Sequence, residues 1–128
     1  MKSLIIDATA EEIFLSFINN KNIYTSRYEN SKSNFEKLIT LITDFLVNQK
    51  EKIDNINKIY VNRGPGSFAG IRNSLSVVKG LHLIKNIDYY CFSYKDFNEL
   101  NVVNHQDVVD LCDKFKIKKN LIKPLYLS

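Results

Sequence analysis

The sequence predicts a single-domain α/β protein with a mixed sheet. Three short apolar segments come first, and helical and extended apolar patterns then alternate to the end of the chain. The 128 residues are enough for one domain with a real core, and 45% hydrophobic and 25% charged residues are ordinary for a globular protein. No apolar run is long enough to span a bilayer, and Asp7 ends the first apolar run before a signal peptide can develop. We therefore expect a cytoplasmic protein.

The first three segments are expected to form two successive hairpins. Residues 4–6 are a continuous apolar run, which is typical of a central strand. Residues 13–18 follow after a turn, and an Asn-rich turn separates them from residues 23–28.

A helix is predicted next, over residues 34–49, with Ser33 or Asn34 as its cap. Its apolar residues cover an arc wider than the stripe of about 100° that is needed to cover one sheet, so one side is expected to face a partner. These residues are Phe35, Leu38, Ile39, Leu41, Ile42, Phe45 and Leu46.

The pattern of the second half of the sequence predicts a strand, a glycine-rich turn and a helix, followed by another strand. The first strand is residues 59–61, and Ser67 is placed to cap a helix over 68–83. A strand over 88–93 leads to a short helix or turn over 94–100. A last amphipathic helix after Asn104 is marked by Val108, Leu111, Cys112 and Phe115.

The decapeptide of residues 63–72 is the most distinctive segment, because it holds three of the four glycines, one of the two prolines and two of the three arginines. Gly66, Gly70 and Ser74 lie four residues apart and indicate a small-residue strip that permits close approach of a partner. On spacing alone, a tight structural connection is slightly favoured over an interface. The segment is not a phosphate-binding P-loop, because no Gly-Lys-Ser/Thr follows its glycines.

Several polar residues have a structural and a functional interpretation. Arg63 and Arg72 are either ordinary surface charges or, as is favoured in a chain rich in lysine, paired with carboxylates of a partner or of a neighbouring element. Asp7 with Thr9 indicates either a turn cap, which is favoured, or a residual nucleotide site.

The remaining polar and sulfur-containing side chains indicate no metal site and no cofactor. The histidines are isolated, and the two cysteines lack metal-ligand spacing and are expected to be buried apolar residues. The lysines are spread along the chain, with local density only between Lys114 and Lys123. This pattern favours a solvated face over a nucleic-acid groove.

The order of the predicted elements matches the ribonuclease H-like lobe of the actin and sugar kinase superfamily. Gly64-Pro65-Gly66-Ser67-Phe68-Ala69-Gly70-Ile71-Arg72 closely resembles the signature Gly-Pro-Gly-Ser-Phe-Thr-Gly-[Ile/Val/Leu]-Arg of the bacterial tRNA threonylcarbamoyladenosine biosynthesis protein TsaB, also called YeaZ. The start at residues 5–10 and the end at residues 124–128 are similar to that family as well, although Ala8 and Ala69 stand where it commonly has Thr.

The resemblance covers residues 2–100 and 105–128, whereas the family carries a second lobe between these two parts. It implies a shortened member with an internal loss at about residues 100–104. The implied organisation is a ribonuclease H-like N-terminal lobe over 1–100, with a C-terminal helix and tail over 101–128 that pack on the same lobe.

The resemblance also implies a non-catalytic subunit that needs no cofactor. Such a subunit binds a TsaD-like catalytic subunit through the two N-lobe helices, acts with a TsaE-like ATPase, and reaches tRNA only through the complex. Two alternatives remain open: a minimal actin-like nucleotide-binding or hydrolysing remnant at Asp7 and Thr9, and a homodimer formed through the same helices. The expected interface residues are Leu38, Leu41, Ile42, Phe45, Gly66, Ser67, Phe68, Gly70, Ile71, Arg72 and Ser74, with Arg63, Gly64 and Pro65 in the turn.

Overall fold

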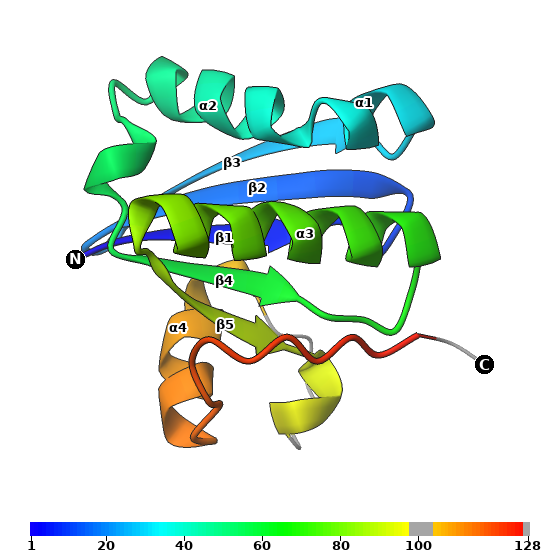
Figure 1. Ribbon diagram of the computed structural model, residues 1–128. Coiled ribbons are helices and arrows are strands. Elements are labelled where there is room, and N and C mark those ends of the chain that lie inside the picture. The colour runs from blue at the N-terminus through cyan, green and yellow to red at the C-terminus, as the bar shows by residue number, and fades with distance from the viewer. Residues whose placement is uncertain (98–103, 127–128) are drawn as a thin grey trace.

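The structure, a computed structural model, describes residues 1–97 and 104–126. Within these residues it consists of one mixed sheet with helices on both faces (Figure 1). In chain order the strands are β1 (Lys2–Asp7), β2 (Glu12–Asn19), β3 (Asn22–Glu29), β4 (Lys58–Asn62) and β5 (Asp88–Phe92). The helices are α1 (Lys32–Glu36), α2 (Leu38–Asn48), α3 (Phe68–Lys85) and α4 (His105–Lys114), with short 3-10 turns η1 (Ile53–Asn55) and η2 (Tyr94–Phe97).

The strand order across the sheet is β3-β2-β1-β4-β5. Strand β2 pairs antiparallel with both β1 and β3, while β4 pairs parallel with β1 and β5. Strand β1 is central because its apolar run suits a strand covered on both faces, and Leu4, Ile5 and Ile6 are fully buried there. This arrangement confirms the predicted α/β fold class and its ribonuclease H-like lobe.

Each face of the sheet has its own apolar cluster, because alternate residues of β1 point to opposite faces. Leu4 and Ile6 belong to the cluster that includes the buried residues of α2 and α3, whereas Ile5 packs with Val108 and Cys112 of α4. Figure 1 shows α1, α2 and α3 on one side of the sheet and α4 on the other. The helix near the C-terminus therefore covers the face that the earlier helices leave open.

The region predicted as one helix over 34–49 is divided into α1 and α2. Lys37, with φ −115° and ψ 28°, interrupts the helical backbone between them. The predicted cap is also wrong: the side chain of Ser31, not of Ser33 or Asn34, accepts a hydrogen bond from the backbone N–H of Asn34 at 3.2 Å. The apolar spacing continues through Lys37, so the periodicity contains no sign of the break.

The other elements begin and end close to their predicted bounds. The short helix predicted over 94–100 is η2, but its residues 98–100 lie outside the described residues, as do most of the predicted internal loss and the last two residues. In the described part of the chain, no helix is both long and apolar enough to cross a membrane.

Candidate functional site

The glycine-rich turn between β4 and α3 is packed tightly against two other parts of the chain. Gly64 has φ +112°, a conformation that strongly favours glycine, and it is joined to Pro65 by a cis peptide bond. A Cβ at Gly64 would collide with the carbonyl of Leu125, and one at Gly66 would collide with the carbonyl of Thr9. Two of the glycines therefore serve contacts within the chain.

Helix α3 begins as predicted, with the Ser67 side chain accepting a hydrogen bond from the backbone N–H of Gly70 at 3.1 Å. The predicted small-residue strip, however, faces inward. Gly70 lies against the carbonyl of Ala8, and Ser74 is fully buried, with its hydroxyl donating to the carbonyl of Ile71 at 3.1 Å. This corrects the expectation that Gly66, Gly70 and Ser74 receive a partner, because the turn after β1 occupies that space.

Four further residues expected at the interface are also core residues. Leu38, Ile42 and Phe45 of α2 and Ile71 of α3 are at most 1% exposed and pack in the cluster with β1. A partner cannot reach them, so the wide apolar arc of the first helix mostly reflects deep burial. Leu41 is half-buried at the border of this cluster.

The outward face of α3 carries a different strip of small and short polar side chains, which the sequence pattern did not predict. This strip, which we call the outer seam, consists of Ala69, Asn73, Ser76 and Gly80. Its members follow one another at four, three and four residues along the helix, and all are exposed or half-exposed. Asn73 folds back to donate to the carbonyl of Ala69 at 2.7 Å, which keeps its side chain close to the helix. A Cβ added at Gly80 would meet no atom within 4 Å, so the seam is open.

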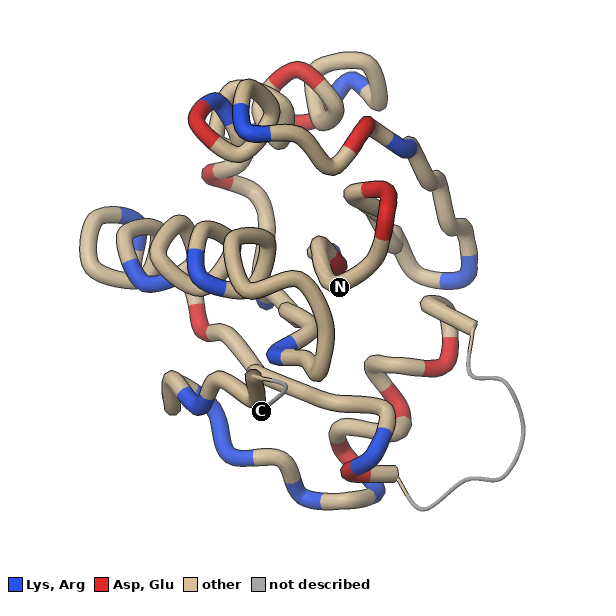
Figure 2. The backbone as a smooth tube through the Cα atoms, turned by 90° about the vertical axis from the view of Figure 1, so that its right-hand side faces the viewer, with Lys and Arg blue, Asp and Glu red and all other residues tan. Residues whose placement is uncertain are grey.

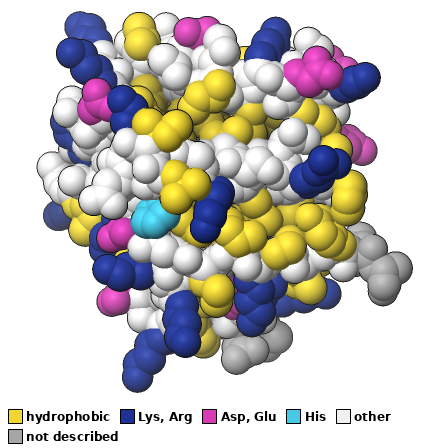
Figure 3. Space-filling view, viewed as in Figure 1, with side chains coloured by type: hydrophobic (Ala, Val, Ile, Leu, Met, Phe, Trp, Pro, Cys, Tyr) yellow, Lys and Arg dark blue, Asp and Glu magenta, His cyan; other side chains and the backbone are white. Residues whose placement is uncertain are grey.

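Exposed apolar side chains flank the outer seam. On α3 these are Phe68, Leu83 and Ile84, which are 58%, 70% and 80% exposed, and α2 adds Ile39 and Val47. Figure 3 shows hydrophobic side chains gathered on the face that carries α2 and α3. The sequence contained one signal that could have indicated this exposed face: some apolar residues of α3 lie outside its buried apolar stripe.

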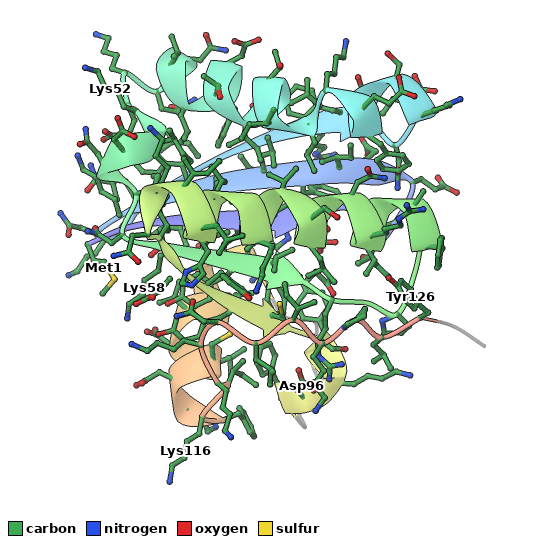
Figure 4. All side chains as sticks on the ribbon, in the orientation of Figure 1. Met1, Lys52, Lys58, Asp96, Lys116 and Tyr126 are labelled. Carbon is green, nitrogen blue, oxygen red and sulfur yellow. The ribbon has the colours of Figure 1, made fainter. Side chains whose placement is uncertain are left out.

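The two arginines of the decapeptide have different environments. The guanidinium of Arg63 donates to both carboxylate oxygens of Asp96, at 2.6 and 3.3 Å, and to the carbonyl of Lys123 at 3.4 Å. Figure 4 shows Asp96 on η2, below the C-terminal tail (residues 115–126). The expected carboxylate partner of Arg63 is thus within the chain, whereas Arg72 is exposed on α3.

Asp7, at the end of β1, lies in a network of polar side chains. One carboxylate oxygen accepts hydrogen bonds from the backbone and hydroxyl of Thr9, at 3.2 and 2.8 Å, and the other accepts from Asn62 at 3.2 Å and lies 3.5 Å from His105 Nε2. Burial raises the pKa of the Asp7 carboxyl, but the hydrogen bonds from His105, Thr9 and Asn62 outweigh burial and hold this pKa below its ordinary value. The favoured interpretation of Asp7 as a turn cap is confirmed by the two bonds from Thr9.

His105 connects this network to β2 and β3. Its Nδ1 shares a hydrogen bond of 2.9 Å with the hydroxyl of Ser16, which shares another of 2.9 Å with Thr25. The side chains of Ser16, His105 and Asp7 thus contact one another in a row, in the order found in a catalytic triad. Ser16, however, is fully buried and hydrogen-bonded to both His105 and Thr25, so it cannot attack a substrate. An open hollow of about 660 Å³, lined in part by Asp7, Arg27 and Tyr94, lies beside His105.

The two cysteines, and the acidic residues that the structure describes, indicate no further chemistry. Cys91 and Cys112 are buried free thiols, and burial raises their pKa values to about 11 and about 12, which makes them unreactive. Among residues 1–97 and 104–126, no three His, Cys, Asp or Glu side chains are grouped so that they could hold a metal ion.

Comparison with known proteins connects this geometry to one family. A protein of Buchnera aphidicola is 28% identical over 90 residues, which are 70% of this chain and 43% of the relative. A protein of Escherichia coli is 25% identical over 83 residues, 65% of this chain and 36% of the relative. Both are named tRNA threonylcarbamoyladenosine biosynthesis protein TsaB. No protein-family model matches the chain.

A solved structure, YeaZ from Pseudomonas aeruginosa, superposes with a TM-score of 0.66 at 21% identity, over 72% of this chain and 43% of that one. The structural likeness supports the fold, and the sequence similarity confirms the resemblance to the TsaB family that the decapeptide predicted. The chain spans only 36% to 43% of the length of these relatives.

Proposed function

We propose that this TsaB-like chain is a non-catalytic scaffold subunit in tRNA threonylcarbamoyladenosine biosynthesis. In this role it binds and supports a TsaD-like catalytic subunit, a TsaE-like ATPase joins the assembly, and the TsaD-like subunit acts on the tRNA. The similarity to curated TsaB proteins supports the pathway. The outward face of α3 supports the mode of action.

The observation that carries the proposal is the outer seam with its apolar flanks. Small side chains let the backbones of two helices approach closely, and the exposed Phe68, Leu83 and Ile84 supply apolar area that water leaves on docking. A monomeric protein seldom leaves such side chains grouped around an open helix face. The expected contacts from the decapeptide are thus reduced to the exposed Phe68 and Arg72 and the half-exposed Ser67.

A non-catalytic role agrees with the state of the polar network around Asp7. Its carboxylate is engaged by Thr9, Asn62 and His105 of the same chain, and Ser16 is buried. A nucleotide-bound metal ion at Asp7 would have to compete with these contacts for the carboxylate oxygens, which weighs against the nucleotide-binding alternative. Absence of ATP binding by the purified chain, together with unchanged complex function in Asp7→Ala, would exclude that alternative.

The docking surface is tested by calorimetry with the TsaD-like protein of the same organism. Gly80→Trp fills open space, so we expect a folded chain whose affinity for the partner falls at least tenfold. Gln106→Trp places the same side chain on the exposed surface of α4 and serves as the control. Equal affinity of the Gly80→Trp variant and the wild type would refute docking at the outer seam.

Two further measurements separate the roles of the surface. Mass measurement in solution, with and without the TsaD-like protein, distinguishes a heterodimer from the alternative homodimer. Because both would form through the same helix face, Gly80→Trp should dissociate whichever dimer is present. Depleting the chain in cells and measuring threonylcarbamoyladenosine in tRNA tests the pathway, since loss of the modified nucleoside is expected.

A further inference from the structure

The positive charge of the chain is concentrated in one short segment. Five of the 18 Lys and Arg residues lie between Lys114 and Lys123, where there is no acidic residue. The rest of the chain has 13 basic and 14 acidic residues, so this segment accounts for the whole positive net charge of +4. Figure 2 shows basic positions following one another along the segment that leads to the C-terminus. Such concentration produces a local field that a dispersed set of lysines would not.

The backbone that carries these lysines is held firmly on the domain. Asn120 donates its N–H to the carbonyl of Tyr89 at 2.7 Å, and its side chain accepts from the N–H of Tyr89 at 3.0 Å. Leu125 donates to the carbonyl of Arg63 at 2.8 Å. Binding through this segment therefore needs little further ordering of the backbone.

The fold adds basic residues from α3 to those of the C-terminal tail. Lys116, Lys118 and Lys123 line a hollow of about 330 Å³ on one side of the tail. Arg72 and Lys79 of α3 line a second hollow of about 560 Å³ on the other side, formed with Ile122, Pro124 and Tyr126 of the tail. The segments that carry these basic residues are far apart in the sequence, and the tail brings them together.

Two acidic side chains near the tail are engaged within the chain. Asp96, which lines the hollow with Lys118 and Lys123, is paired with Arg63 at 2.6 Å. Asp88 accepts from the side chain of Asn120 at 2.9 Å and lies 3.7 Å from Lys119. Neither carboxylate is left to neutralise Lys118 or Lys123, which are exposed.

The acidic side chains of α4 reach only one end of the tail. Asp110 and Asp113 line a third hollow together with Lys116, so they weaken the positive field at that lysine. Lys118 and Lys123 do not line this hollow. Among the tail lysines, the positive field is therefore strongest from Lys118 onward, and Arg72 and Lys79 add positive charge on the side of the tail that meets α3.

We infer that the C-terminal tail, with Arg72 and Lys79, is a binding surface for the phosphate backbone of RNA. Lysines and an arginine along an extended segment suit a series of phosphates, and the exposed Leu121, Ile122 and Tyr126 provide apolar contacts for unpaired bases. The choice of RNA over an acidic protein rests on the proposed function. The surface borders the docking face, since Arg72 and Ser76 line the hollow beside the tail. Lys118 and Lys123 line the other hollow, and through them the scaffold would keep its own contact with tRNA when the catalytic partner is bound.

The test is fluorescence anisotropy of a labelled tRNA transcript with the chain alone, at several salt concentrations. The variant combines Lys116→Gln, Lys118→Gln, Lys119→Gln and Lys123→Gln. We expect it to bind at least tenfold more weakly, and the slope of log K against log salt to become shallower by about 0.7–0.9 for each phosphate that the variant no longer neutralises. The same four positions changed to Arg should retain binding.

The control variant carries the same change in net charge on other exposed lysines: Lys21→Gln, Lys32→Gln, Lys37→Gln and Lys50→Gln. Equal weakening by both variants, or no tRNA binding at low salt, would overturn the inference. Polyglutamate that binds as tightly as tRNA at equal salt would assign the surface to an acidic protein. Because no catalytic subunit is present, these outcomes are independent of docking at the outer seam, which Gly80→Trp tests.

Discussion

The carboxylate of Asp7 and Nε2 of His105 lie 3.5 Å apart, joining the end of β1 to the first residue of α4. His105 also shares its Nδ1 with Ser16 of β2, so one imidazole contacts two strands of the sheet. The contact helps hold α4 against its face of the sheet and occupies Asp7. The contact between Asp7 and His105 therefore stabilises the packing of α4 and leaves Asp7 less available to bind a ligand.

Asp7→Asn should reduce the dependence of stability on acid pH. The pKa of Asp7 is lower in the folded than in the unfolded chain, so its ionised form stabilises the fold above the ordinary value of 3.8. This stabilisation is lost as the pH falls below that value towards the folded pKa. Urea unfolding from pH 7 to pH 3 should show a smaller loss of free energy of unfolding in Asp7→Asn than in the wild type. Parallel curves would contradict the lowered pKa.

Gly70→Val should unfold the protein or destabilise it severely. A Cβ at this position collides with the carbonyl of Ala8, and backbone atoms cannot give way as a flexible side chain can. We expect a loss of about 3 kcal/mol or more in chemical denaturation. In Gly80→Ala of the same helix, the added methyl group meets no atom within 4 Å, so a gain of about 0.5–1 kcal/mol is expected. Near-wild-type stability of Gly70→Val would show that Ala8 does not occupy this space.

Arg63→Lys should loosen the C-terminal tail although the charge is kept. Lysine cannot reproduce the two hydrogen bonds to Asp96 together with the one to the carbonyl of Lys123. We expect a loss of about 1–2 kcal/mol in the free energy of unfolding and faster proteolysis of the tail. Arg72→Lys is the matched control, and its exposed position predicts a change within about 0.5 kcal/mol. If both variants behave alike, the Arg63 contacts do not secure the tail.

Much of the fold could be predicted because local chemistry decides it. The fully apolar run of β1 requires cover on both faces, and Ser67 caps α3 through its own hydrogen bond to Gly70. The break at Lys37 could not be predicted, since apolar residues recur at helical spacing on both sides of it.

The site was harder to predict than the fold. Gly66, Gly70 and Ser74 form a regular small-residue strip, but spacing alone does not tell whether the chain itself or another protein fills it. His105 had no recognisable signal either, because 89 residues separate it from Ser16.

By itself, the sequence determined the order of strands and helices, the start of α3 and the family resemblance, because these depend on apolar periodicity, capping and a short motif. Tertiary structure alone decided what each face of a helix meets. It placed Ala8 and Thr9 against the glycines, left the outer seam around Gly80 open, and brought Arg72 of α3 beside the C-terminal tail. Burial and electrostatic proximity depend on contacts between distant segments, and no local pattern specifies them.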